Sequence, residues 1–267
     1  MSDLRQAISD GAVIAKRNVI KIKRVPEVLV FVLLSPIMFV LLFAYVFGGS
    51  IDIPGGSYRE FLIAGIFAQT VVFGATFTGA GLAEDMQKGI IDRFRSLPMS
   101  RSAVVVGRTA SDVIYNAASL LIMALSGLIV GWRIHNGMID ALVAFGLLLL
   151  FAYAISWIMA LVGLMVPSPE VINNASFMVI FPLTFIANTF VPSSNLPTVL
   201  RVFAEWNPVS AVTQAARELF GNIPPGTPEP TVWPMQNPIV YTLIWVVLII
   251  SIFSPLAVTR YRRVKSR

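Results

Sequence analysis

The strongest constraint on the fold is a set of six apolar stretches, each about as long as a membrane-spanning helix. A helix needs roughly 20 mostly apolar residues to cross a hydrocarbon core of about 30 Å. Only 13% of the residues are charged, whereas soluble chains average about 25%. The sequence therefore predicts an all-α polytopic membrane protein that forms a single domain over residues 1–267. The predicted spans are Val28–Phe47, Phe61–Leu82, Val113–Gly131 (with its helix beginning near Val104), Ile139–Val166, Val171–Val191 and Pro238–Thr259.

The Lys and Arg residues are divided unequally between the two sides of these spans. Sixteen of the twenty lie in the N-terminal segment, the 83–112 gap and the C-terminal tail, which six spans place on one side. Because cytoplasmic loops are enriched in Lys and Arg, both termini are predicted to be cytoplasmic. The charges flank spans and form no single basic face, so the net charge of +6 predicts no nucleic-acid partner. The other side receives Arg59, Arg133, Arg201 and Arg217.

Several classes of chemistry are excluded by the residues that the sequence lacks. Cysteine is absent and His135 is the only histidine, so the sequence predicts neither a disulfide nor a zinc site. No G-x-x-x-x-G-K-[ST] motif is present, and Gly107-Arg108-Thr109 lacks the upstream glycine and the lysine. The chain is therefore not expected to hydrolyse ATP itself. The scattered carboxylates and single histidine also disfavour a membrane-embedded enzyme.

Charged residues are expected at the ends of the spans and not deep inside them. This pattern disfavours a gradient-driven carrier, whose proton or ion relay usually needs intramembrane carboxylates. It favours an apolar or amphiphilic transported compound. Arg108 and Asp112 are four residues apart and share one helix face. We expect them to form an ion pair at the interface where the third span enters the bilayer.

Two cytoplasmic segments have the periodicity of amphipathic helices. Residues 1–27 carry apolar or small residues at helical spacing and are predicted to lie along the headgroups. Residues 84–101 carry a second apolar stripe, and Pro98 ends that helix. Its pattern allows two interpretations, a helix folded on the membrane surface or one that docks on a cytoplasmic partner. The stripes are Leu4, Ile8, Ala12, Ala15, Val19 and Ile22 in the first segment, and Met86, Ile90, Phe94 and Leu97 in the second.

Three blocks of sequence resemble one family of transport proteins. Residues 89–108 read G-I-I-D-R-F-R-S-L-P-M-S-R-S-A-V-V-V-G-R, which is similar to the signature of type-2 ABC exporter permeases. Residues 181–192 (F-P-L-T-F-I-A-N-T-F-V-P) with Leu196-Pro197 resemble that family's fifth span and following external segment. Trp206-Asn207-Pro208 with Arg217 resembles its segment before the last span. Within the family, the sequence is most similar to the daunorubicin- and doxorubicin-resistance permeases of actinobacteria.

This resemblance implies a six-span permease of the bacterial cytoplasmic membrane. Its partners would be two copies of a separate ABC ATPase subunit and a second permease half, either identical or related. ATP and magnesium would bind to the ATPase subunit, so this chain would bind no cofactor. The exported compound would be drug-like or lipid-like, and export of a polysaccharide or lipid-linked glycan is the alternative. Residues 192–237 would form an external segment, in which short helices within 193–220 re-enter the membrane and close the path from outside.

Candidate residues are expected in two roles, one implied by the resemblance and one by the apolar character of the spans. The 84–101 segment would be a coupling helix that sits in a groove of the ATPase. Its candidate contact residues are Glu84, Asp85, Gly89, Asp92, Arg93, Phe94, Arg95, Leu97, Pro98 and Arg101. Aromatic residues in the spans, with one amide, are candidates for lining the path, although aromatic residues at these spacings also pack between helices. They are Phe39, Phe43, Phe73, Phe77, Phe177, Phe181, Phe185 and Asn188.

Overall fold

In a computed structural model, the chain is described over residues 10–11, 13–15, 17, 20, 34, 37–38, 40–47, 57–96, 102–223, 226–227 and 229–263. Nearly half of the predicted first span and most of the predicted N-terminal helix lie outside these residues. The described residues from 10 to 20 are helical, and a short π-helix, η1, covers Phe43–Phe47. Four of the candidate site residues, Phe39, Leu97, Pro98 and Arg101, also lie outside the described part.

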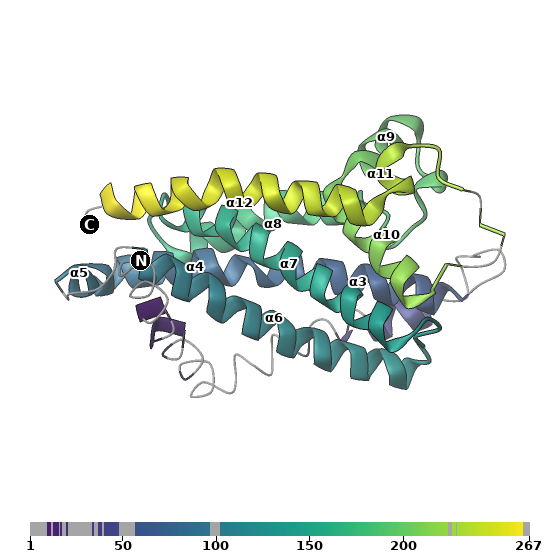
Figure 1. The fold of residues 1–267 in the computed structure, drawn as a ribbon, viewed down its shortest axis with the longest axis horizontal. Coiled ribbons are helices and arrows are strands. Elements are labelled where there is room, and N and C mark those ends of the chain that lie inside the picture. The colour runs from purple at the N-terminus through teal and green to yellow at the C-terminus, as the bar shows by residue number, and fades with distance from the viewer. Residues whose placement is uncertain are drawn as a thin grey trace.

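The described helices form an elongated bundle (Figure 1). Helix α3 (Tyr58–Gly74) continues past a break at Ala75 into α4 (Thr76–Gln87). Helix α6 (Ala103–Val130), α7 (Met138–Gly163) and α12 (Pro238–Arg263) run along the same axis. Within the described residues, four stretches are long and apolar enough to cross a membrane, namely α3 with α4, α6, α7 and α12. These match four of the predicted spans, and α6 begins next to Val104, as expected.

The predicted span Val171–Val191 is wrong at its outer end. Helix α8 covers only Pro169–Phe185, and residues 186–190 form turns. The reason is that the carbonyl groups of Asn188 and Thr189 in this turn accept hydrogen bonds from Arg217 of a later helix, in place of helical hydrogen bonds. At 1.5 Å per residue the 17 residues of α8 are about 25 Å long. The helix is therefore shorter than the hydrocarbon core of about 30 Å.

Short helices follow α8 at one end of the bundle, as the resemblance implied. They are η2 (Ser193–Asn195), α9 (Thr198–Trp206), α10 (Pro208–Phe220) and α11 (Trp233–Gln236). Helix α10 packs against α3, α7 and α12, so it is part of the bundle and not a surface loop. Helix α5 (Ile90–Arg95) and the last turns of α12 lie at the opposite end (Figure 1). That arrangement agrees with the prediction that the C-terminal end and the segment containing α5 lie on the same side.

The apolar core consists of two separate clusters. The larger one fills the middle and the half opposite α5, where α3 is buried along most of its length. The smaller cluster lies at the end that carries α5 and joins residues from six parts of the chain, including Ile14 near the N-terminus and Tyr261 near the end of α12. In contrast, many large apolar side chains of α12 are exposed, as expected where a helix faces lipid.

Helices α4 and α7 cross at two glycines. A Cβ atom on Gly163 would lie 2.4 Å from the carbonyl oxygen of Gly79, which is closer than any side chain tolerates. Small residues allow such close backbone approach between membrane helices. Because nothing larger fits at this crossing, α4 and α7 are expected to move together as one unit.

Candidate functional site

The segment that joins α4 to α5 is bent at a glycine. Gly89 has φ +65°, in the left-handed region that favours glycine, and α5 begins at the next residue. The predicted helix from Glu84 onward is therefore two helices, and the expected stripe that runs through Met86 and Ile90 is interrupted at the bend. Glu84 and Asp85 belong to the end of α4, whereas Asp92, Arg93, Phe94 and Arg95 belong to α5.

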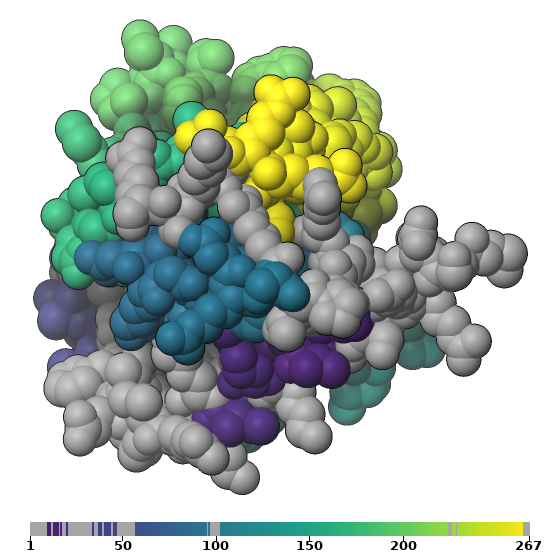
Figure 2. Space-filling model, turned by 90° about the vertical axis from the view of Figure 1, so that its left-hand side faces the viewer, coloured from purple at the N-terminus to yellow at the C-terminus, as the bar shows by residue number. Residues whose placement is uncertain are grey.

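Helix α5 is attached to the bundle by one side and exposed on the other. Ile91 is fully buried in the smaller cluster, together with Leu82 of α4 and Val105 of α6. Asp92 and Arg93 are exposed at the end of the molecule, where Figure 2 shows α5 in blue beside the end of α12 in yellow. Ile91 was not predicted, because the four-residue spacing favoured Ile90. The signal available was the apolar pair itself in the G-I-I-D motif.

Arg17 links the N-terminal residues to both sides of this bend. Its Nη2 lies 2.8 Å from Oδ2 of Asp85, whose side chain is only 6% exposed. Its guanidinium carbon also lies 4.9 Å from the centre of the Phe94 ring. A buried carboxylate is stable only when it is paired, so this ion pair accounts for the position of Asp85 inside the protein. The neighbouring Glu84 accepts a hydrogen bond of 2.6 Å from Lys88.

The N-terminal residues meet the bundle through close backbone contact. A Cβ atom on Gly107 of α6 would lie 2.5 Å from the carbonyl oxygen of Gly11 and 2.7 Å from Cβ of Ile14. Ile14 is buried and Val13 is exposed. The face that packs on α6 thus includes Gly11 and Ile14, whereas the apolar stripe predicted for residues 1–27 lies, apart from Ala15, outside the described residues.

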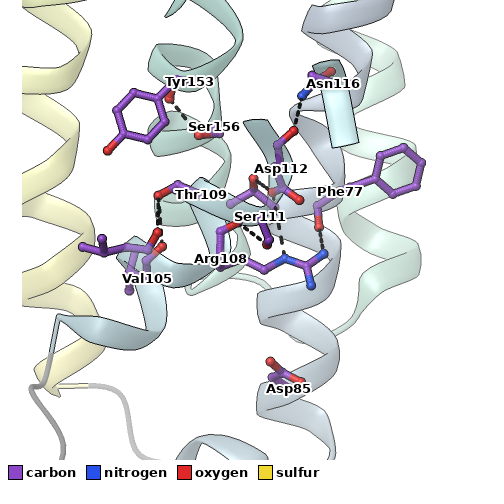
Figure 3. Close-up of polar contacts among 12 residues, drawn as sticks. Phe77, Asp85, Val105, Arg108, Thr109, Ser111, Asp112, Asn116, Tyr153 and Ser156 are labelled. Atoms are coloured by element: carbon purple, nitrogen blue, oxygen red, sulfur yellow. Dashed lines mark hydrogen bonds and ion pairs between the residues drawn. The ribbon is translucent and has the colours of Figure 1, made fainter. Parts of the chain in front are cut away.

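A buried polar cluster lies between α4 and α6 (Figure 3). Nη2 of Arg108 donates a hydrogen bond of 2.7 Å to the carbonyl of Phe77, and its Nε lies 3.9 Å from the Asp112 carboxylate. The Thr78 hydroxyl donates to Asp112, and Nδ2 of Asn116 donates to the Asp112 carbonyl over 3.0 Å. The predicted pairing of Arg108 with Asp112 is confirmed. Asp112 faces α4 and is 3% exposed, so the pair lies between two helices, and its position at the membrane interface stays a prediction.

Two glycines of the second span make room for this cluster. A Cβ atom on Gly81 would lie 2.3 Å from Cζ of Arg108, and one on Gly74 would lie 2.0 Å from Oδ1 of Asn116. The α3–α4 surface is thus indented where the polar side chains of α6 cross it. Near the start of α6, these glycines and the hydrogen-bonding partners compensate for the burial of Arg108 and Asp112.

Phenylalanine rings form a continuous row along α8. The ring centres of Phe177 and Phe181 are 4.9 Å apart, and those of Phe181 and Phe185 are 4.0 Å apart. The row continues from Phe185 to Phe190 over 4.6 Å. It ends at Phe43 on one side, 4.7 Å from Phe190, and at Phe73 on the other, 6.2 Å from Phe177. Five of the eight path candidates therefore lie in one row.

The remaining described path candidates lie elsewhere. Phe77 packs against Tyr115, with ring centres 5.1 Å apart, and lies beside the polar cluster. Asn188 is buried, and its backbone N–H donates to the Ser210 hydroxyl of α10 over 3.0 Å. Phe190, which completes the row, was not predicted, because the sequence alone does not show that residues 186–190 turn back toward Phe43.

Comparison with known proteins agrees with this architecture. Residues 11–220 match the family model of the ABC-2 type transporter. The chain is 33% identical over 204 residues to the daunorubicin resistance ABC transporter permease protein DrrB1 of Streptomyces coeruleorubidus, covering 76% of this chain and 72% of that protein. It is 24% identical over 194 residues to the probable doxorubicin resistance ABC transporter permease protein DrrC of Mycobacterium tuberculosis, covering 72% and 66%.

A more distant relative comes from outside the bacteria. The putative transport permease ycf38 of Cyanophora paradoxa is 23% identical over 219 residues, with 80% of this chain and 75% of that protein covered. In this family the ATPase is a separate subunit, in agreement with the missing nucleotide-binding motif. The protein therefore belongs to the ABC-2 type transporter family, as the multi-pass membrane permease of an exporter that works with an ABC ATPase.

Proposed function

We propose that this permease exports a hydrophobic or amphiphilic compound across a bacterial cytoplasmic membrane, from the cytoplasm or the inner leaflet. It acts with a second permease half and two ATPase subunits, and ATP and magnesium bind to those subunits. The observation that carries the proposal is helix α5, which is fixed to the bundle by Ile91 and exposes Asp92 and Arg93 at the end of the molecule.

Helix α5 has the features needed to transmit motion from an ATPase. Burial of Ile91 and the contact of Phe94 with Arg17 hold its inner side, so a displacement of α5 is passed on to α4 and to the N-terminal residues. The exposed charges set register and partner choice when they meet complementary charges. Binding of the ATPase shifts the permease between two states only through contacts that differ between those states.

The row of phenylalanines along α8 supports an apolar path. Phe177 is 56% exposed, and its neighbours Phe181 and Phe185 are partly exposed, so an apolar aromatic surface follows this helix. Such a surface binds planar apolar compounds by stacking and excludes strongly hydrated ones. It favours a drug-like or lipid-like compound over a polysaccharide. The names of two relatives, which refer to daunorubicin and doxorubicin resistance, are consistent with this class.

The docking role of α5 is tested by co-purification in mild detergent. Arg93→Glu and Phe94→Ala are each expected to lower the amount of ATPase subunit that co-purifies, while the amount of permease in the membrane stays unchanged. Arg133→Glu is the matched control, because Arg133 is exposed and lies between α6 and α7, away from α5. Undiminished ATPase recovery with both α5 variants would contradict the docking role.

The path is tested by substitutions on two sides of α8. Phe181→Ala removes a ring from the middle of the row and is expected to reduce export of an aromatic compound, with ATPase assembly unchanged. Met178→Ala is the control, because Met178 is on the same helix and 79% exposed, outside the row. Equal export by the two variants, measured as efflux of a fluorescent anthracycline from loaded cells, would show that the row does not line the path.

A further inference from the structure

Helix α10 supplies hydrogen-bonding partners for the outer end of α8. The last carbonyl groups of a helix have no partner within the helix, and inside a membrane each needs a donor from elsewhere. Nδ2 of Asn207, at the start of α10, donates to the carbonyl of Leu183 over 2.8 Å. Further along α10, Nη2 of Arg217 donates to the carbonyls of Asn188 and Thr189 over 2.7 and 3.1 Å. The end of α8 is thus completed by side chains of a different helix.

Arg217 is a fully buried cation that is surrounded by neutral groups. It is 1% exposed, and its Nε donates to the carbonyl of Phe61 in α3 over 3.0 Å. Its guanidinium carbon lies 3.4 Å from the centre of the Phe61 ring. Among the residues that the structure describes, no carboxylate lies within ion-pair distance of it. The partial negative charge at the C-terminal end of α8 and the face of the ring therefore stabilise the guanidinium.

The groups joined by Arg217 come from three elements that are distant in sequence. They are α3, the turn after α8, and α10 itself. The turn also lies directly against α3, because a Cβ atom on Gly65 would be 2.0 Å from the carbonyl oxygen of Thr189. We propose that Arg217 is a positioning residue that holds α10 against α3 and the 186–190 turn, and so keeps the external end of the permease closed. The external end opens when the guanidinium leaves these three carbonyl groups.

The chemistry of the contact suits a closure that opens and re-forms. A buried ion pair with a carboxylate is expensive to separate, whereas carbonyl groups released from Arg217 are neutral and are readily hydrated in an open state. One guanidinium nitrogen, Nη1, is buried and has no hydrogen-bond partner among the described residues. The closed state is therefore stabilised by less than the full bonding capacity of the side chain. This inference rests on the proposed function, because opening to the outside has a purpose only in an exporter.

The test uses a cysteine in the contact between α10 and the turn. The chain contains no cysteine, so a single cysteine reports only its own position. Ser210→Cys places a thiol at a fully buried position of α10, where the native hydroxyl accepts a hydrogen bond from Asn188. Its reaction with a membrane-impermeant maleimide, added from the external side without ATP, is compared in three backgrounds: Arg217 retained, Arg217→Lys and Arg217→Met. Ser194→Cys is an exposed reference, and Ala152→Cys in α7 is a buried one.

With Arg217 retained, we expect Ser210→Cys to stay protected. In the Arg217→Met background its labelling rate should rise roughly tenfold or more, in line with the loss of hydrogen bonds to a charged group. Arg217→Lys should give an intermediate rate, and Ala152→Cys should stay protected in all three backgrounds. Unchanged protection of Ser210→Cys in the Arg217→Met background would overturn the proposal. Equal labelling of both buried cysteines in both variants would overturn it too, because it would indicate a general loss of packing.

The labelling outcome is independent of the proposed function. Neither the ATPase subunit nor a transported compound takes part in the measurement. If the ATPase fails to co-purify while Ser210→Cys behaves as expected, the proposed exporter assembly is wrong and the closing contact stands. The opposite combination leaves the exporter assembly in place and removes Arg217 from the external closure.

Discussion

Each end of the bundle contains an arginine that lies over a phenylalanine ring, and the two arginines are held in different ways. At the end with α5, Arg17 is 35% exposed in its side chain, forms an ion pair with Asp85 and lies 4.9 Å from the Phe94 ring centre. At the opposite end, Arg217 is buried, binds only carbonyl groups and lies 3.4 Å from the Phe61 ring centre. One contact joins charges near water, and the other fixes a charge inside the protein.

The difference indicates how rigidly each end is held. A partly exposed ion pair has a small net energy and adjusts to small displacements of its partners. A planar guanidinium donates to three fixed carbonyl groups only when all three are in matching positions. Its hydrogen bonds are therefore expected to form together or break together. The end with α5 is thus suited to follow a partner, whereas the external end is suited to switch between two states.

Replacing each arginine by lysine should produce the largest difference in stability between the two ends. Arg217→Lys keeps the charge but cannot reach three carbonyls at once, so we expect the free energy of unfolding to fall by about 2 to 4 kcal/mol. Arg17→Lys keeps an ion pair with Asp85, so the free energy of unfolding should fall by less than about 1 kcal/mol. Denaturant titration of the two purified variants in the same detergent measures both values. Equal losses would remove the distinction between the two ends.

A methyl group added at the close backbone contacts should have the next largest effect. Gly65→Ala at the external end places Cβ against the Thr189 carbonyl, and we expect a loss of about 1 to 3 kcal/mol from overpacking. Gly107→Ala meets Gly11 and Ile14 at longer distances and should cost less. The same titration ranks the two variants, and a larger loss for Gly107→Ala would reverse the assignment of the more rigid end.

The smallest effect is expected at Lys88, next to the bend between α4 and α5. The pKa of Lys88 lies above its ordinary value because Glu84 accepts a hydrogen bond from the ammonium group and carries the opposite charge. A raised pKa contributes stability below the ordinary pKa of lysine, and this contribution is lost only as the pH rises through the raised value. This contribution is present at neutral pH and Lys88→Gln removes it, but an exposed pair contributes little, so the unfolding midpoint should fall only slightly at neutral pH. A clear decrease would show that this exposed pair stiffens the bend.

Hydropathy alone was sufficient to predict where most membrane helices lie. A run of apolar residues is a local property, so the spans at α3–α4, α6, α7 and α12 were found within a few residues of their observed ends. The fifth span was predicted too long, because apolar residues such as Phe190 and Val191 continue past the end of α8. The turn at residues 186–190 is fixed by Arg217, which donates a hydrogen bond to the carbonyl of Thr189, 28 residues away in sequence.

The candidate site was predictable only where its signal was local. The charges of α5 and the pair Arg108–Asp112 follow from helical spacing. The partner of Asp85 is Arg17, 68 residues away, and no pattern in one sequence connects them. Arg217 was assigned to the external side by the distribution of charge, but its burial depends on three carbonyl groups whose positions exist only in the folded protein.

Because α8 is short, the surroundings of its outer end depend on the thickness of the membrane. A bilayer that is thicker than a helix must thin locally, or the helix end lies below the level of the headgroups. The Arg217 contact begins where α8 ends, so it lies at a depth that changes with lipid acyl-chain length. Thin bilayers should bring the three carbonyl groups nearer to water and favour their release, whereas thick bilayers should keep them dry. Reconstitution in lipids of graded chain length would then change the open fraction of the external end without any change in the protein.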